Sequence, residues 1–147
     1  MTGVATPDSG TIAFEGQPSP PRGAPEEWRA RVACVYQQSS LVPSLSIVEN
    51  LFLNKLPKNA LGLVDWSRAR KDARTALISW GLDIDVDAAV GKLTVVQKQL
   101  VEIVRALLQG SRFIILDEPT AHLEPGEIAK LFDRMRALAG QGVTFLY

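Results

Sequence analysis

The sequence predicts an α/β domain built on a buried parallel sheet. An apolar run at 113–116 is followed by a helical stripe of apolar residues between 128 and 138, and then by a second apolar run at 143–147. A strand, a helix and a strand in this order form a crossover unit whose two strands are parallel. The chain has 147 residues, 46% of them hydrophobic and 22% charged, which is enough for one ordinary soluble domain with its own core.

The N-terminal segment predicts a strand, a loop and a second strand. Apolar and polar residues alternate from Thr11 to Glu15 and stop at Gly16, which is typical of a half-buried strand. The prolines between 18 and 25 predict a loop, and 26–31 a short helix leading into an apolar strand at 32–36. Cys34, the only cysteine, lies in that strand, so we expect a buried, inert thiol rather than a reactive one.

Helix-capping signals organise the middle of the chain. Ser46 and Glu49 have the spacing of a capping box, which predicts a helix over 46–54. Apolar residues at helical spacing predict two more helices, 66–80 ending at Gly81 and 97–109 ending at Gly110.

Three aspartates at 83, 85 and 87 imitate the opening of a calcium-binding loop. The sixth and twelfth positions of that loop are Ala88 and Thr94, where glycine and glutamate are required. A solvated loop is therefore the favoured interpretation, with calcium as the alternative.

Charge and hydropathy exclude several classes of protein. Sixteen Lys and Arg balance sixteen Asp and Glu without a long run of either sign, so we expect no dedicated nucleic-acid binding. Neither a leader nor an apolar run long enough for a membrane span is visible, which predicts a cytoplasmic protein.

The strongest chemical signal is Asp117, Glu118 and Pro119, directly after the apolar strand 113–116. The carboxyl ends of parallel strands form the edge where ligands bind. One carboxylate there can hold a hydrated Mg²⁺ ion while the other orients an attacking water, a division of roles that phosphoryl transfer requires. Taken alone, the two carboxylates could equally be a polar turn.

Four motifs in order resemble the nucleotide-binding ATPase subunit of ABC transporters. Residues 114–120 (IILDEPT) resemble the Walker B strand, and residues 93–97 (LTVVQ) resemble a drifted form of the LSGGQ signature. Residues 35–37 (VYQ) resemble the Q-loop, and residues 121–124 (AHLE) resemble the D-loop. The stretches 7–12, 35–43, 64–66 and 99–103 are most similar to the first of the two tandem ATPase domains of monosaccharide importers of the ribose, xylose and galactose type. The resemblance covers almost the whole chain.

The resemblance implies a partial P-loop NTPase domain of the ABC type, with a parallel sheet and an inserted helical subdomain. It implies that 1–38 and 111–147 are portions of the α/β core, and that 39–110 are the helical subdomain and the signature helix. It further implies ATP and Mg²⁺ as ligands in the complete domain. The implied partners are a second ATPase domain and transmembrane permease subunits, which would hold the chain at the inner face of the membrane.

Individual residue roles also follow from the resemblance alone. Glu118 would be the hydrolytic carboxylate, Asp117 a metal ligand, and Gln37 would serve both catalysis and the metal. The remaining implied nucleotide contacts are Leu93, Thr94, Val95, Val96 and Gln97 of the signature and Ala121, His122, Leu123 and Glu124 of the D-loop. His122 is not expected to be catalytic, because the switch histidine of the family follows the next strand, beyond Tyr147.

The chain departs from the family pattern in two respects. It contains no G-x-x-x-x-G-K-[ST] phosphate loop, so both ends are expected to lie inside the family's domain, after Walker A and before the switch histidine. Val95 and Val96 occupy the two glycine places of the signature, where a Cβ obstructs close approach to a phosphate. A weakened site there is favoured over an intact one, and Thr94 with Gln97 also fits a plain capping box.

Two functions therefore remain open, part of an importer ATPase or a non-catalytic remnant that acts as an interaction module. Between the Q-loop and the signature, apolar residues exceed what one helix face can bury, which favours a docking cleft for a membrane subunit over simple core packing. The residues behind this expectation are Leu41, Val42, Pro43 and Leu45 of the loop and Leu51, Phe52 and Leu53 of the first helix.

Overall fold

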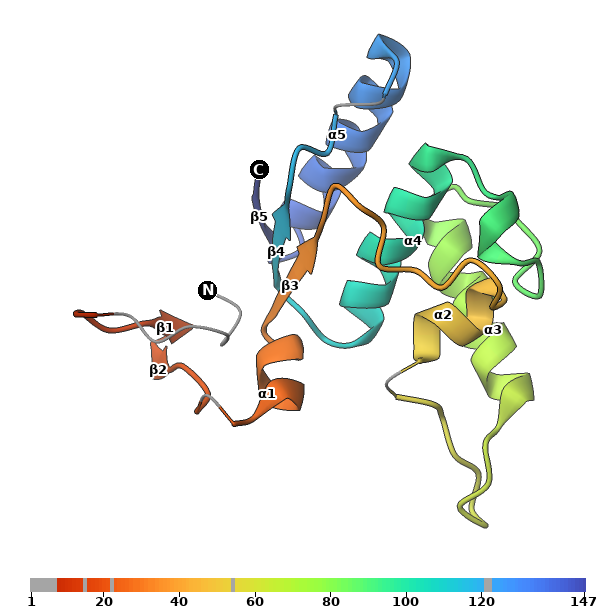
Figure 1. The fold of residues 1–147 in the computed structure, drawn as a ribbon, viewed down its shortest axis with the longest axis horizontal. Coiled ribbons are helices and arrows are strands. Elements are labelled where there is room, and N and C mark those ends of the chain that lie inside the picture. The colour runs from red at the N-terminus through yellow and green to blue at the C-terminus, as the bar shows by residue number, and fades with distance from the viewer. Residues whose placement is uncertain (1–7, 15, 22, 54, 121–122) are drawn as a thin grey trace.

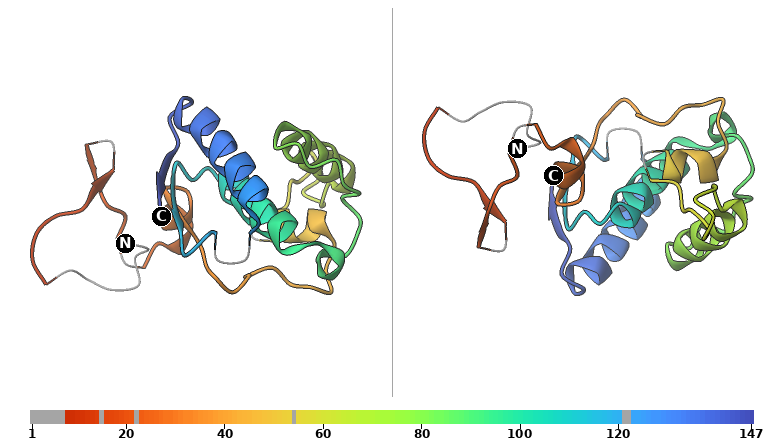
Figure 2. Two further views of the ribbon diagram at one scale, coloured as in Figure 1. Left: turned by 90° about the horizontal axis from the view of Figure 1, so that it is seen from above. Right: turned by 90° about the horizontal axis from the view of Figure 1, so that it is seen from below.

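The computed structural model describes residues 8–147 except 15, 22, 54, 121 and 122. A three-stranded parallel sheet in the order β3-β4-β5 forms its centre, which confirms the predicted fold class. The strands are β3 (Val32–Val35), β4 (Phe113–Leu116) and β5 (Thr144–Leu146). Successive right-handed crossovers that move in one direction place their helices on one face. Accordingly, α4 (Val95–Leu108) and α5 (Pro125–Ala139) lie on the same side of the sheet (Figure 1, Figure 2).

Only one face of the sheet is fully covered by described residues. Ile114 and Leu116 point towards the helices and are buried, whereas Phe113 and Ile115 on the other face are half-buried. Cys34 pairs with Ile115 and shares this second face, so the expectation of a buried thiol is wrong and the side chain is partly accessible. Partial burial still raises the pKa of the Cys34 thiol above its usual value.

The helical segment packs beyond α4 as a second cluster. It comprises α2 (Ile47–Phe52), α3 (Trp66–Ser79) and a single 3₁₀ turn over Val90–Lys92 before α4. Ser46 and Thr94 cap α2 and α4 through capping boxes, as the sequence predicts. The aspartates predicted to form a solvated loop carry local bonds, since Asp87 pairs with Arg70 at 2.8 Å and its N–H donates to Oδ1 of Asp85.

The N-terminal elements differ from the prediction. Instead of one strand over 11–15, Ala13–Phe14 (β1) pairs antiparallel with Gln17–Pro18 (β2) around Gly16, whose φ is 76°. The sequence predicts a loop at Pro18, but Pro18 pairs with Ala13 in a two-stranded ribbon, where a residue without an N–H can occupy an edge. The following helix α1 spans Pro25–Arg29.

Three of the seven apolar residues expected to be in excess are in the core. Leu41, Leu51 and Phe52 are 6%, 1% and 9% exposed, because the loop before α2 folds onto α2 and onto segment 86–91. The prediction of a docking cleft from surplus apolar residues is therefore wrong for these three side chains. Leu53, by contrast, is 48% exposed. None of the helices in the described part of the chain has both the length and the apolar character to cross a bilayer.

Asn50 fixes the loop before α2. Its side chain is fully buried; Oδ1 accepts from the N–H of Val42 at 2.8 Å, and Nδ2 donates to the carbonyls of Val42 and Ser46 at 3.1 and 3.0 Å. We expect Asn50→Ala to lower the free energy of unfolding by about 2–3 kcal/mol, because these backbone groups lose their partner. Urea denaturation measures this. Asn59→Ala, which removes two exposed bonds, should cost less than about 1 kcal/mol, and equal losses would contradict the role of Asn50.

Candidate functional site

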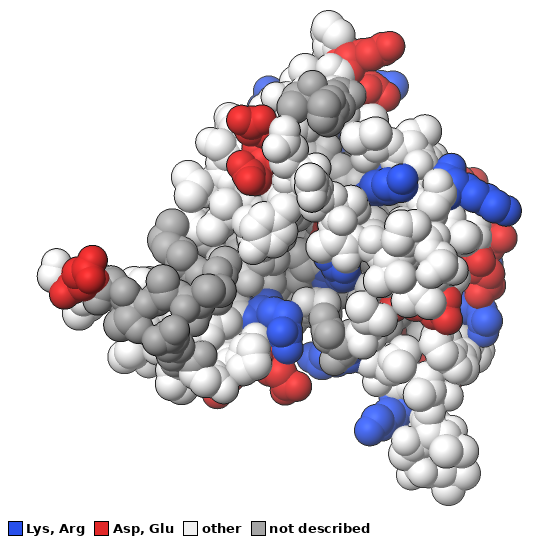
Figure 3. Space-filling model, in the orientation of Figure 1, with Lys and Arg blue, Asp and Glu red and all other residues white. Residues whose placement is uncertain are grey.

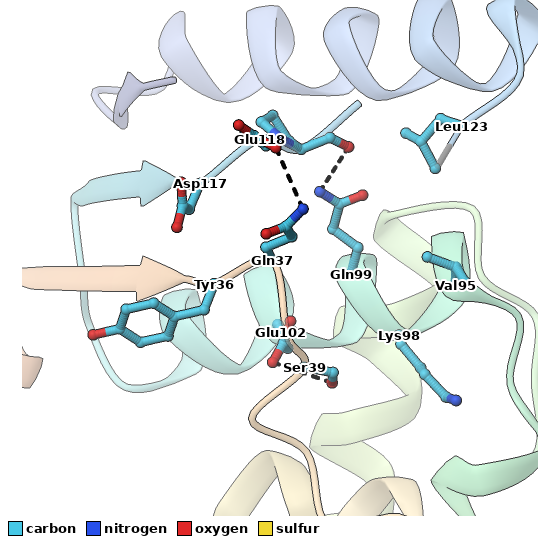
Figure 4. Close-up of a pocket in the computed structure, with 11 residues that line it drawn as sticks. Tyr36, Gln37, Ser39, Val95, Lys98, Gln99, Glu102, Asp117, Glu118 and Leu123 are labelled. Atoms are coloured by element: carbon cyan, nitrogen blue, oxygen red, sulfur yellow. Dashed lines mark hydrogen bonds between the residues drawn. The ribbon is translucent and has the colours of Figure 1, made fainter. Parts of the chain in front are cut away.

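The ends of β3 and β4 bring the predicted catalytic residues together. Asp117 follows β4, and its N–H donates to the carbonyl of Val35 in β3 at 2.9 Å. This bond continues the β3–β4 hydrogen-bond ladder by one residue, so the chain leaves both strands at the same edge of the sheet. Gln37, beyond β3, donates through Nε2 to Oε2 of Glu118 at 3.3 Å (Figure 4). Residues 81 positions apart in the sequence thus meet at one point.

A cleft of about 260 Å³ opens at this edge, between the strand ends and the first turns of α4 (Figure 4). Asp117 and Glu118 are exposed to it, and Gln99, Lys98 and Val95 approach from α4. Leu123, from the segment after β4, completes the lining beside them. Two carboxylates and an amide at the carboxyl end of a parallel sheet can hold a hydrated divalent cation and orient a water molecule.

Glu118 has an unusual backbone conformation. Its φ is 47°, and it is the one non-glycine residue with positive φ in the described part of the chain. A side chain in the left-handed region costs about 1–2 kcal/mol, so surrounding contacts must hold it there. Sequence reasoning identified Glu118 as a candidate but had no signal for this strain.

The strain gives a testable consequence. Asn adopts the left-handed region far more readily than Glu, so Glu118→Asn should raise the melting temperature by about 2–4 °C, the equivalent of about 1 kcal/mol. Thermal denaturation followed by circular dichroism measures the shift. Asp117→Asn introduces the same residue at ordinary φ and should not raise the melting temperature. An unchanged or lower value for Glu118→Asn would mean that the left-handed conformation stores no strain.

The signature-like segment forms the start of α4. Leu93 and Val96 are half-buried against the core, whereas Thr94 and Val95 are exposed, Val95 by 56%. Gln97 accepts from the N–H of Thr94 at 2.9 Å and donates its own N–H to the Thr94 hydroxyl at 3.2 Å. Both side chains are thus engaged in capping, and Val95 is the residue of this segment that lines the cleft.

The D-loop-like segment is described only in part. Ala121 and His122 lie outside the described residues. Leu123 lines the cleft, and Glu124 is exposed at the N-terminus of α5, where its N–H donates to the Glu127 carboxylate at 3.0 Å.

Sequence reasoning missed a buried polar network behind the cleft. Glu102 in α4 is only 4% exposed, and its Oε1 accepts from the N–H and hydroxyl of Ser40 at 2.7 and 2.9 Å. Arg105 lies 3.8 Å from the same carboxylate and also bonds the Ser40 hydroxyl. Burial lowers the pKa of the Arg105 guanidinium, an effect that the Glu102 charge opposes. A Glu inside an otherwise apolar helix face was the available signal.

Comparison with known proteins assigns the family. The family model described as ABC transporter matches residues 1–121, and the chain belongs to this family. The ribose import ATP-binding protein RbsA 1 of Burkholderia thailandensis is 42% identical over 147 residues, which cover 100% of this chain and 29% of that protein. The arabinose import ATP-binding protein AraG 1 of Burkholderia ambifaria is 39% identical with the same coverage. The chain thus spans less than a third of these curated relatives.

Solved structures agree on the fold. CbiO1 of Clostridium perfringens, described as part of the ABC transporter complex CbiONQ, has a TM-score of 0.78 at 25% identity and is matched over 98% of this chain and 57% of that one. A nucleotide-free ATP-binding cassette from an ABC transporter gives 0.79 at 25% identity, over 99% and 61% of the two chains. The predicted ABC-type P-loop NTPase fold is therefore confirmed, and the relatives are sugar import proteins.

Proposed function

We propose that residues 1–147 form part of the ATP-binding subunit of an importer for a sugar of the ribose or arabinose class. ATP and Mg²⁺ would bind between this domain and a second ATPase domain, and hydrolysis would drive transport through permease subunits at the inner face of the membrane. The carrying observation is the Gln37–Glu118 contact at the sheet edge, in a chain whose whole length aligns with sugar import proteins.

In this proposal Glu118 polarises the attacking water and Asp117 lies on the metal side. Gln37 hydrogen-bonds Glu118 and would also be a ligand of the metal, so it could respond to both. Residues 93–97 and 121–124 would face the nucleotide held by the second domain. Residues 1–38 and 111–147 would supply the core, and 39–110 the helical subdomain with the signature helix.

A hybrid protein tests the proposal. In this hybrid subunit, residues 1–147 replace the matching segment of the B. thailandensis ribose import protein, which supplies the rest of the chain. We expect Mg²⁺-dependent ATP hydrolysis and ribose uptake with the ribose permease. A hybrid subunit that folds and assembles but does not hydrolyse ATP would contradict the proposal.

A non-catalytic interaction module is the second candidate. It is favoured by the valines at 95 and 96, which occupy the two glycine places of the signature. The genomic reading frame upstream of Met1 distinguishes the importer ATPase from the interaction module. Continuation into a strand and a phosphate loop supports the ATPase, and a promoter and stop codon there support the module.

For the permease contact, we propose the cleft of about 490 Å³ beside β3. Trp28, Leu53 and Arg105 line it, and Leu53 offers an exposed apolar anchor. In the hybrid subunit, Leu53→Glu should reduce co-purification with the permease about tenfold or more while leaving the melting temperature unchanged, because a charge enters an apolar contact.

Two variants serve as controls for this contact. Ile78→Glu changes a similarly exposed side chain on α3, away from the cleft, and should not affect assembly. Leu41→Glu should unfold the subunit, since Leu41 is in the core. Normal assembly of Leu53→Glu would exclude this cleft as the docking surface.

A further inference from the structure

The left-handed turn at Glu118 is tied to α4 by one side chain. Gln99, half-buried in the second turn of α4, donates through Nε2 to the carbonyl of Pro119 at 2.9 Å (Figure 4). This carbonyl belongs to the residue that follows Glu118. The bond therefore fixes the peptide plane at the exit of the strained turn, although Gln99 does not hydrogen-bond the Glu118 carboxylate itself.

Gln37, the hydrogen-bond partner of Glu118, lies in a segment that is also bonded to α4, one turn further along that helix. Glu102 lies three residues after Gln99, on the same side of α4. Its buried carboxylate accepts from Ser39 at 3.3 Å and from the N–H of Ser40 at 2.7 Å. These serines directly follow the Gln37 segment, so α4 holds the chain on both sides of the Gln37–Glu118 contact.

We propose that Gln99 is a positioning residue that holds the Glu118 turn against α4 and thereby keeps the Glu118 carboxylate within reach of Gln37. Glu102 holds the Gln37 segment against α4 in the same way, through its bonds to Ser39 and Ser40. The chemical use of this contact rests on the proposed function, but the contact itself requires neither nucleotide nor partner.

The two anchors differ in how they can be tested. Removing the Glu102 carboxylate leaves Arg105 without its buried partner. A Glu102 variant would therefore lose both the positioning of the Gln37 segment and the stability of the fold, and one measurement would not separate the two losses. Gln99 is neutral and half-buried, and Gln99→Leu removes its side-chain amide at similar size without leaving a charge unpaired. Gln99→Glu keeps the shape and replaces the donor with a carboxylate that repels the Pro119 carbonyl.

Nuclear magnetic resonance of the 147-residue chain tests the proposal directly. In Gln99→Leu and Gln99→Glu, we expect the side-chain amide signals of Gln37 to shift towards those of a free glutamine. The scalar coupling that reports φ of Glu118 should leave its left-handed value. Val101→Ala is the matched control, because it creates a buried defect on the same helix without facing the cleft. It should lower the melting temperature but leave both signals unchanged.

Turnover of the hybrid subunit gives the functional readout. Gln99→Leu should lower kcat about 10- to 100-fold with the KM for ATP within about twofold, as expected for a misplaced catalytic group. Unchanged Gln37 and Glu118 signals, or equal shifts in Val101→Ala, would overturn the positioning role. Failure of the unmutated hybrid subunit to hydrolyse ATP would instead count against the proposed function, while the resonance experiment still decides the role of Gln99.

Discussion

Glu118→Gln in the hybrid subunit should lower ATP turnover by about 10²- to 10⁴-fold, the range contributed by a general base. The substitution keeps the shape of the side chain, but an amide cannot polarise a water molecule as a carboxylate does. Affinity for ATP should stay within a few fold, because the change acts on the transition state more than on the bound ground state. Steady-state hydrolysis and nucleotide binding, measured on the same preparation, separate the two effects.

Asp117→Asn is the companion variant for this prediction. Like Glu118→Gln, it removes one negative charge at this edge of the sheet, but the charge lost belongs to the side chain that we propose as the metal ligand. We expect it to raise the Mg²⁺ concentration needed for half-maximal turnover. Equal turnover by Glu118→Gln and its parent would remove Glu118 from the mechanism, and identical Mg²⁺ profiles for both variants would contradict the division of roles.

The elements predicted well are those set by local sequence. Ser46 and Thr94 cap helices α2 and α4, and their capping boxes need only residues three positions apart, although α4 begins two residues before the predicted 97. Strand β4 could be recognised because four consecutive apolar residues end at two carboxylates. In each case the physical cause lies within one short window of the chain.

The features missed depend on distant contacts. Leu41 is buried because Asn50 and segment 86–91 hold its loop, and neither contact has a signature around residue 41. The tie from Gln99 to Pro119 spans 20 residues, and that from Glu102 to Ser40 spans 62. In the sequence, Gln99 is a polar residue of an amphipathic helix within the family-like stretch 99–103, and nothing there indicates its contact with Pro119.

The candidate site likewise contains residues that the local sequence identifies and a feature that it does not. Gln37, Asp117 and Glu118 could be named from motifs and from the rule that ligands bind at the carboxyl edge of a parallel sheet. The left-handed turn at Glu118 could not, because nothing in a Glu-Pro sequence requires positive φ. The nucleotide role of the signature valines remains a prediction, since the second domain that would hold the nucleotide is itself part of the proposal.

The 147-residue chain by itself should bind MgATP with a Kd above about 1 mM, weaker than about −4 kcal/mol. Triphosphate affinity comes mainly from a cradle of backbone amides and a lysine, and the sequence contains no such loop. The described cleft cannot replace it, because Lys98 is the one cation among its lining residues, against the acidic Glu102, Asp117 and Glu118. Isothermal titration calorimetry of the chain, with the hybrid subunit as the positive control, measures the difference. Micromolar binding by the chain alone would reveal a phosphate site other than the one the family uses.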